Sequence, residues 1–289
     1  MSQIYKKHYK KLLIIPFLML ALALTQIAWQ TATTGDFIQK GVSLKGGTTV
    51  TINDATVDEV GLESFLKQTF EGRDINVRAL TGAGIKTGVI IDSDATSLEE
   101  INGLVAAIKS NIGDKELTVE NVGSSLGDSF FRDTIKAMFF AFILMGIVVF
   151  YYFRIPVPSI AVILAAFSDI VVSIAIVNLL GIKVSTAGIA AFLMLIGYSV
   201  DTDILLSTRV LKTKVGTVYD RVINAMKTGL TMNLTTMAAI VAALLLTHSE
   251  VLKQIMTILL IGLLVDIINT WIQNAGILRW YMEKKKNEN

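Results

Sequence analysis

The stretch AFLMLIGYSVDTDILLSTRV, residues 191–210, places two carboxylates in a run that otherwise suits a lipid environment. It belongs to a longer apolar segment, 184–206, and a helix needs roughly 20 apolar residues to cross about 30 Å of hydrocarbon. A charge near the bilayer centre costs about 2.5–3.5 kcal/mol on insertion scales, so an acid there is a candidate for function. The stretch therefore predicts a membrane-spanning helix in which Asp201 and Asp203 have a specific role.

The composition of the whole chain agrees with this prediction. Its 289 residues are 53% apolar and 17% charged, and the mean hydropathy of +0.60 is too high for a soluble protein of this length. The chain has no cysteine and only two histidines, far apart, which argues against disulfides, thiolate chemistry and a histidine-built metal site. Gly46 and Gly47 lack the lysine and hydroxyl residue of a phosphate-binding loop, so we interpret them as a turn. We predict no metal and no cofactor.

Apolar runs of membrane-spanning length occur six times. The predicted transmembrane helices are 12–29, 134–153, 159–180, 184–206, 230–247 and 251–278. Pro156 and Pro158 each lack an N–H group and disfavour helix at the preceding residue, so we expect two helix breaks in this segment. The first run follows lysines, as a signal peptide does, but it is longer than a typical signal-peptide core and no A-x-A-like site follows. We therefore predict an uncleaved anchor.

Lysine and arginine are unevenly distributed around the predicted spans. Outside segment 30–133, most of them lie before the first span, at Arg154, between residues 209 and 227, and after residue 278. Within segment 30–133, acids outnumber bases. Because basic residues favour the cytoplasmic side, we predict a multi-pass protein of the cytoplasmic membrane whose tails, 1–11 and 279–289, are cytoplasmic. Segment 30–133 is then extracytoplasmic. The same rule accounts for the basic inner loop, so we predict no nucleic-acid partner.

Segment 30–133 contains short alternating strands and amphipathic helices. The predicted strands are 43–45 with 48–52, 75–79, 88–92 and 117–122, and the predicted helices are 56–70 and 97–108. Ser97, followed three residues later by Glu100, has the spacing of a capping box. Strand, helix, strand, strand, helix, strand is the ferredoxin-like order. We predict a polytopic α-helical membrane protein: six transmembrane helices, five of them in a membrane domain at 134–278, with an inserted α+β ferredoxin-like (βαββαβ) external domain at 30–133.

Four acids lie within the predicted spans: Asp169, Asp201, Asp203 and Asp266. On a helix, Asp201 and Asp203 are about 200° apart, so they face different neighbours. Arg209 follows them within one or two helical turns. Hydrogen-bonded packing and a relay of protons are equal alternatives for Asp169 and Asp266. For Asp201 and Asp203 we favour a proton or ion relay, because asparagine or serine would satisfy packing at a lower energetic cost.

Two motifs around the predicted external domain resemble those of the SecF family of protein-export membrane subunits. GVSLKGGT at 41–48, which contains Gly46 and Gly47, resembles the family's glycine-rich motif after the first span. NVGSSLG at 121–127 resembles the segment that leads into the second span, although Ser124 stands where proline is usual. The six-span topology with one external domain extends the resemblance over the whole chain.

A third motif lies in the fourth span. Its resemblance to the family's I-G-Y-S-[IV] rests on Gly197, Tyr198 and Ser199. Bacterial SecF usually carries its acid at the position of Thr202, whereas this chain is similar to the archaeal form, with acids on either side. Asp201 falls where the related SecD motif has its acid, and Arg209 matches the family's arginine. The resemblance thus favours Asp201 for the energised role, with Asp203 as its helper or a packing contact.

The resemblance implies a non-enzymatic auxiliary subunit. It would pair with a SecD-like subunit in a twelve-span unit of the resistance-nodulation-division permease superfamily. It would act on the Sec translocon channel, and promote proton-gradient-linked export of unfolded secretory polypeptides across the lipid bilayer. The external domain would contact or retain the emerging polypeptide.

Two other classes of protein remain alternatives from the residues alone. An independent ion- or proton-coupled transporter of small hydrophobic molecules would line its path with the same acids, but it would be favoured by discontinuous helices or an internal repeat, and neither is visible in the sequence. An intramembrane enzyme would need a histidine, cysteine or serine constellation, or the G-x-G-D spacing of an aspartyl protease, which is absent from the sequence. We therefore predict no enzymatic activity.

Overall fold

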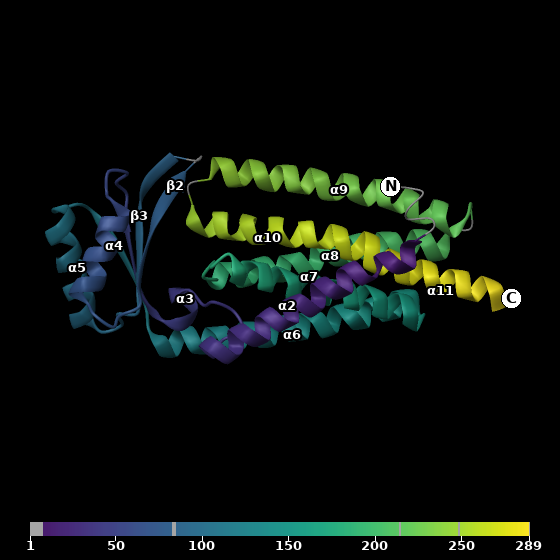
Figure 1. Cartoon of the computed structure of the whole chain (residues 1–289), viewed down its shortest axis with the longest axis horizontal. Helices are drawn as coiled ribbons and strands as arrows, with labels where there is room; N and C mark the ends of the chain where they lie inside the picture. Colours follow the sequence, from purple (N-terminus) through teal and green to yellow (C-terminus); the bar gives the residue numbers. More distant parts are fainter. Residues whose placement is uncertain (1–7, 83–84, 214, 248, 289) are drawn as a thin grey trace.

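The computed structural model describes residues 8–82, 85–213, 215–247 and 249–288. Within these residues, six helices are long and apolar enough to cross a membrane. They lie side by side in an elongated bundle, and a small sheet domain covers one end of it (Figure 1). Residues 1–7 of the predicted N-terminal tail and residue 289 of the predicted C-terminal tail lie outside the described part.

Each long helix extends beyond its predicted span at one end or at both. They are α2 (Ile14–Thr34), α6 (Ser124–Phe153), α7 (Pro156–Leu179), α8 (Thr186–Lys212), α9 (Val218–Leu246) and the continuous run α10 (Glu250–Ile268), η1 (Asn269–Asn274) and α11 (Ala275–Glu288). The predicted domain boundary at 133 falls inside α6. Hydropathy marks only the part of a helix that suits hydrocarbon, whereas the backbone hydrogen bonds can continue into adjoining polar residues.

The turn between α6 and α7 contains one break and not the predicted two. Arg154 ends α6 in the left-handed conformation, with φ 53°, and Pro156 is the first residue of α7. Pro158 lies in the first turn of α7, where a backbone N–H has no partner within the helix. Its missing N–H therefore removes no helical hydrogen bond, and the prediction of a second break was wrong.

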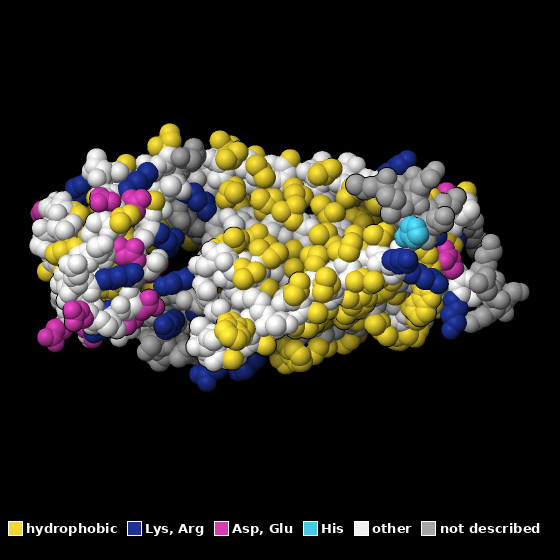
Figure 2. Space-filling model, in the orientation of Figure 1, with side chains coloured by type: hydrophobic (Ala, Val, Ile, Leu, Met, Phe, Trp, Pro, Cys, Tyr) yellow, Lys and Arg dark blue, Asp and Glu magenta, His cyan; other side chains and the backbone are white. Residues whose placement is uncertain are grey.

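The helices α7 and α8 form the centre of the bundle. The apolar stretch of α7 is 72% buried inside the chain, against 6% for that of α6. Figure 2 shows that apolar side chains cover much of the visible face of the bundle, while charged side chains gather over the sheet domain and at both ends of the bundle. A polar side chain on α7 or on the inner face of α8 is thus shielded from lipid by the surrounding helices.

The sheet domain confirms the predicted ferredoxin-like order. Its elements are β1 (Gly47–Ile52), α4 (Glu59–Thr69), β2 (Ile75–Gly82), β3 (Ile85–Ser93), α5 (Leu98–Ile112) and β4 (Leu117–Val122). The strand order is β2-β3-β1-β4, and each neighbouring pair is antiparallel. The two helices cover one face (Figure 1). The core between them and the sheet includes Val50, Ile52, Leu62, Leu66, Ile91, Leu104 and Ile108.

Helix caps define where the two helices of this domain begin. The predicted capping box is present: the Ser97 side chain accepts from the Glu100 backbone N–H, and the Glu100 side chain accepts from the Ser97 N–H. Asp58 caps α4 by accepting from two backbone N–H groups, so this helix starts at Glu59 and not at residue 56. Arg73, just before β2, forms an ion pair with Glu100.

The predicted strand at 43–45 is instead a short helix, α3 (Val42–Lys45). Three alternating residues are too few to specify a strand, and tertiary contacts decide the conformation. Leu44 is fully buried, and the Ser43 hydroxyl accepts a hydrogen bond from the Thr186 N–H at the start of α8. The segment therefore packs on the bundle, and the sheet begins only at Gly47.

We expect acid to weaken the cap of α5 through Glu100. A hydrogen bond from the Arg73 guanidinium, aided by the N-cap N–H groups, lowers the pKa of Glu100 to about 2 from its ordinary 4.5. Because the folded-state pKa is the lower one, this contribution is complete above pH 4.5 and is lost as the pH falls toward 2. Hydrogen exchange of α5 in the Glu100→Gln variant should therefore depend less on pH in this window than in the parent chain.

Glu99→Gln is the matched control, because Glu99 is an exposed acid in the same helical turn. If Glu100→Gln and the parent chain lose protection of α5 along the same pH curve, the ion pair makes no contribution to the domain.

Candidate functional site

Three of the four acids that the sequence places in spans meet in the interior of the bundle. Asp169 lies on α7, Asp203 on α8 and Asp266 on α10, and each is completely buried. These helices pack against one another around Phe192, Leu195 and other apolar residues of the main core. Three carboxyl groups from distant parts of the chain therefore form one polar network in an apolar surrounding.

Asp169 contacts all three helices of the site. Its carboxyl accepts hydrogen bonds from the Ser199 hydroxyl on α8 and from Asn269 Nδ2, at 2.8 Å, in η1. It also lies near enough to Asp266 on α10 for the two carboxyl groups to interact electrostatically. The Asp169 carboxyl therefore ties α7 to α8 and to η1.

Asp203 and Asp266 are linked through Thr270. The Thr270 Oγ1 atom lies 3.0 Å from Asp203 Oδ1 and 2.9 Å from Asp266 Oδ1. Asn274 Nδ2 donates to Asp203 Oδ1 at 2.7 Å, and Asn233 Nδ2 on α9 donates to Asp266 Oδ2 at 2.9 Å. The hydroxyl and amide donors named here are uncharged, so they orient the acids without neutralising them.

The π-helical segment η1 supplies most of these donors. It contributes Asn269 to Asp169, Thr270 and Asn274 to Asp203, and Gln273 Nε2 to the Ser168 hydroxyl at 3.3 Å. Single π-helical turns inside α-helices are often found at functional sites. The predicted site residues include neither Thr270 nor Gln273, although NTWIQN has four polar residues in six within an apolar span.

Several acceptor atoms of the network have spare capacity. Within the described residues, Asp203 Oδ2, Asn269 Oδ1 and Asn274 Oδ1 are buried without a hydrogen-bond partner. A buried polar atom without a partner costs about 1–3 kcal/mol, so such atoms call for an explanation. Each of these oxygens can accept a hydrogen bond from a further donor.

Asp201 and Arg209 lie outside the network. Both are on the exposed face of α8, which also carries Gly197 and Tyr198, whereas Ser199 faces inward and bonds Asp169. The structure thus separates the two acids of the fourth span, as helix geometry predicts: Asp203 joins Asp169 and Asp266, while Asp201 is turned toward the surroundings of the chain.

Gly46 and Gly47 lie at the junction of the sheet domain and the bundle. Gly46 ends α3 with φ 86°, and Gly47 begins β1 with φ 134°. Next to them, Gly41 N donates to Val184 O at 2.8 Å, and Val184 N donates to Gln39 O at 2.7 Å. These backbone bonds join the segment after α2 to the turn between α7 and α8.

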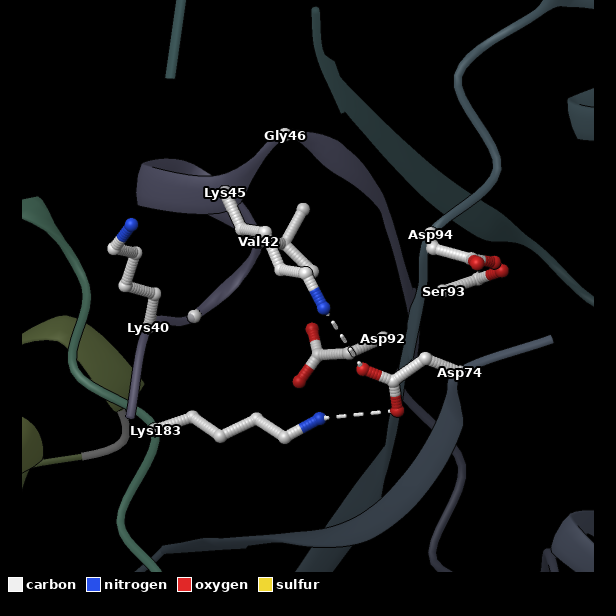
Figure 3. A pocket seen from close by; sticks show the side chains of 10 residues that line it. Lys40, Val42, Lys45, Gly46, Asp74, Asp92, Ser93, Asp94 and Lys183 are labelled. Carbon is white, nitrogen blue, oxygen red and sulfur yellow. Dashed lines mark ion pairs between the residues drawn. The ribbon is translucent and has the colours of Figure 1, made fainter. Parts of the chain in front are cut away.

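A small pocket opens at the same junction (Figure 3). Asp74 at its wall lies 3.7 Å from Lys45 and 3.6 Å from Lys183, which belongs to the turn between α7 and α8. Figure 3 shows both lysines pointing toward this one carboxylate. Exposed ion pairs contribute about 0–1 kcal/mol, so the glycine turn and the backbone bonds hold the junction more than the lysines do.

This fold and this network define a class: polytopic membrane proteins with a ferredoxin-like domain at one end of the bundle and ionisable groups buried between the spans. A family model described as protein export membrane protein SecD/SecF, C-terminal, matches residues 104–284. The chain belongs to this SecD/SecF family of protein-export membrane proteins, which are not enzymes.

Curated relatives of similar length are SecF proteins of archaea. The chain is 38% identical to "Protein-export membrane protein SecF" of Pyrococcus furiosus, over 96% of this chain and 93% of the relative. It is 40% identical to SecF of Methanocaldococcus jannaschii, over 96% of both chains. SecF of Methanothermobacter thermautotrophicus is 39% identical, over 96% of this chain and 94% of the relative.

Solved structures show the same fold. The crystal structure of SecDF, a translocon-associated membrane protein from Thermus thermophilus, matches 95% of this chain with a TM-score of 0.76 and 21% identity. SecDF in its super-membrane-facing form matches with a TM-score of 0.59 and 22% identity. This chain spans 38% of the length of each of these SecDF chains.

Proposed function

We propose that the chain pairs with a SecD-like subunit beside the Sec translocon channel and couples the proton gradient to export of unfolded polypeptides. The buried network of Asp169, Asp203 and Asp266 carries this proposal. Packing alone would be satisfied by amides and hydroxyls, so three mutually adjacent acids inside a bundle indicate a function that uses their protons. Transfer of protons through this network would drive the change in the bundle that moves the sheet domain.

Asp201 supports the pairing with another membrane protein. It lies on the exposed face of α8 inside a span, where a carboxyl group in contact with lipid would be costly. Gly197, one turn earlier on this face, leaves open space: a Cβ atom built there would meet nothing within 4 Å. A small residue beside a polar one allows a second helix to approach closely and to bond the polar group. We propose that a helix of the SecD-like subunit covers this face.

The translocon is proposed as the second partner because the matched SecDF structure is described as translocon-associated. The matched part is 38% of that SecDF chain, which leaves 62% of the chain outside the match. A separate subunit that pairs with this chain would supply the corresponding part. The alternative, an independent transporter of small hydrophobic molecules, requires no such subunit.

Copurification tests this assembly. In gentle detergent, the parent chain is expected to bring down a SecD-like subunit and a channel subunit. Asp201→Leu should reduce the recovery of the SecD-like subunit on the order of tenfold, because an interhelical hydrogen bond in a membrane contributes about 1–2 kcal/mol.

Glu71→Leu serves as the control, since Glu71 is an exposed acid of the sheet domain. Failure of the parent chain to recover either subunit would contradict the proposed assembly. Equal recovery with Asp201→Leu would contradict only the role of this face.

We also propose that the sheet domain is extracytoplasmic and that α2 begins, and α11 ends, on the cytoplasmic side. The basic residues at the bundle end away from the sheet support this orientation. The chain has no cysteine, so single cysteines can be placed at Ser110 on α5 and at Val215 between α8 and α9. In intact cells, an impermeant maleimide should label Ser110→Cys at once and Val215→Cys only after permeabilisation. The reverse labelling would invert the proposed topology.

A further inference from the structure

The Thr270 side chain occupies a particular place between two acids of the network. Its Oγ1 atom is nearly equidistant from Asp203 Oδ1, at 3.0 Å, and Asp266 Oδ1, at 2.9 Å. Asp203 comes from α8, while Asp266 is one helical turn before Thr270 in the last long helix. All three side chains are fully buried, so bulk water does not reach them.

Proton counting determines what this arrangement requires. A hydroxyl group has one proton and can donate only one hydrogen bond, although its oxygen can also accept. A carboxylate has no proton to donate. If both contacts of Oγ1 are hydrogen bonds, one carboxyl group accepts a hydrogen bond from the Thr270 hydroxyl. The other carboxyl group must then be protonated and donate a hydrogen bond to Oγ1. The pair Asp203 and Asp266 then holds one carboxyl proton and one negative charge.

We infer that the Thr270 hydroxyl is the link through which a proton passes between Asp203 and Asp266. In the starting state, Asp203 is protonated and Asp266 is a carboxylate. The Asp203 O–H bond breaks as its proton moves to Oγ1, and the original Oγ1–H bond breaks as that proton moves to Asp266 Oδ1. Thr270 ends as a neutral hydroxyl, and the negative charge has moved from Asp266 to Asp203. The reverse step uses the same bonds.

The other neighbours of the two acids hold them in position. Asn274 Nδ2 donates to Asp203, and Asn233 Nδ2 donates to Asp266. An amide nitrogen donates but does not accept, so it cannot take up a proton from one acid while releasing another. Asp169 accepts from Ser199 and from Asn269, the residue before Thr270. The oxygen of the Thr270 hydroxyl can both accept a proton from one acid and donate its own proton to the other.

The inference rests on the proposed proton relay, and its test separates the two. The full chain in lipid nanodiscs is measured by infrared spectroscopy of protonated carboxyl groups, with Asp203→Asn and Asp266→Asn used to assign the bands. Thr270→Val keeps the shape of threonine but removes the hydroxyl, so it should shift the bands of both acids. Thr270→Ser restores the hydroxyl and should return them. Thr235→Val is the control, because the Thr235 hydroxyl bonds the backbone oxygens of Thr231 and Met232 in α9.

The functional readout is gradient-dependent export in membrane vesicles. Thr270→Val should lower its rate on the order of tenfold, Thr270→Ser should keep it close to the parent rate, and both variants should remain folded. If Thr270→Val leaves the rate and the carboxyl bands unchanged while Asp203→Asn abolishes the gradient dependence, the relay stands and the Thr270 link is overturned. If Asp203→Asn and Asp266→Asn also have no effect on gradient dependence, the proposed relay itself fails.

Discussion

Asp203→Asn is expected to abolish the dependence of export on the proton gradient while leaving the chain folded. Asparagine has nearly the same shape as aspartate, and its amide group can accept from Asn274 and either accept from or donate to the Thr270 hydroxyl, so the packing of the bundle should change little. The amide cannot bind and release a proton in the working pH range. Export in inverted vesicles should then proceed at one rate with or without an ionophore.

Asp201→Asn decides between two interpretations of the same stretch of sequence. The resemblance of its motif to that of SecD favours Asp201 as the energised acid, whereas the structure places Asp203 in the network with Asp169 and Asp266. We expect Asp201→Asn to keep the gradient dependence of assembled complexes. Loss of gradient dependence in Asp201→Asn but not in Asp203→Asn would show that the exposed acid carries the proton and the buried network does not.

Gly47→Val is expected to destabilise the sheet domain by about 3 kcal/mol or more, which is the second large effect. At Gly47, φ is 134°, a backbone conformation that side chains rarely adopt. A Cβ atom at this position would lie 2.3 Å from the backbone oxygen of Ser93 on the paired strand β3. Strand β1 lies in the middle of the sheet, so a shift there disturbs its pairing with both neighbours.

The measurement for Gly47→Val is protease resistance and hydrogen exchange of the sheet domain in the full chain. Gly123→Ala is the matched control, because its φ is −62° and a Cβ atom there would meet nothing within 4 Å. Equal protection of β1 and β3 in the Gly47→Val variant and the parent chain would show that the turn accepts a side chain after all.

Local sequence signals were sufficient for much of the fold. The apolar runs predicted the six long helices, because hydrocarbon contact requires consecutive apolar residues over a known length. Ser97 and Glu100 predicted the start of α5, since a capping box depends on neighbouring residues alone. The prediction failed at residues 43–45, where burial of Leu44 against the bundle outweighs the local alternation.

The candidate site was only partly predictable, because it depends on contacts between residues that are far apart in the sequence. The rarity of acids in apolar runs identified Asp169, Asp203 and Asp266 individually. Their meeting depends on which faces of α7, α8 and α10 pack together, and hydropathy contains no information about that choice. Thr270 was missed because one hydroxyl in a membrane helix usually bonds its own backbone, and only the neighbouring acids make this one different.

The sequence by itself determined the membrane class, the inserted ferredoxin-like domain, the family and the presence of costly acids in the spans. These features depend on composition, on local periodicity and on short motifs, which are properties of neighbouring residues. The tertiary structure decided that Asp203 is inside with Asp169 and Asp266 while Asp201 is outside. Asp201 and Asp203 are two positions apart on one helix, so their side chains point about 200° away from each other. The packing of the other helices therefore decides which of the two acids is buried.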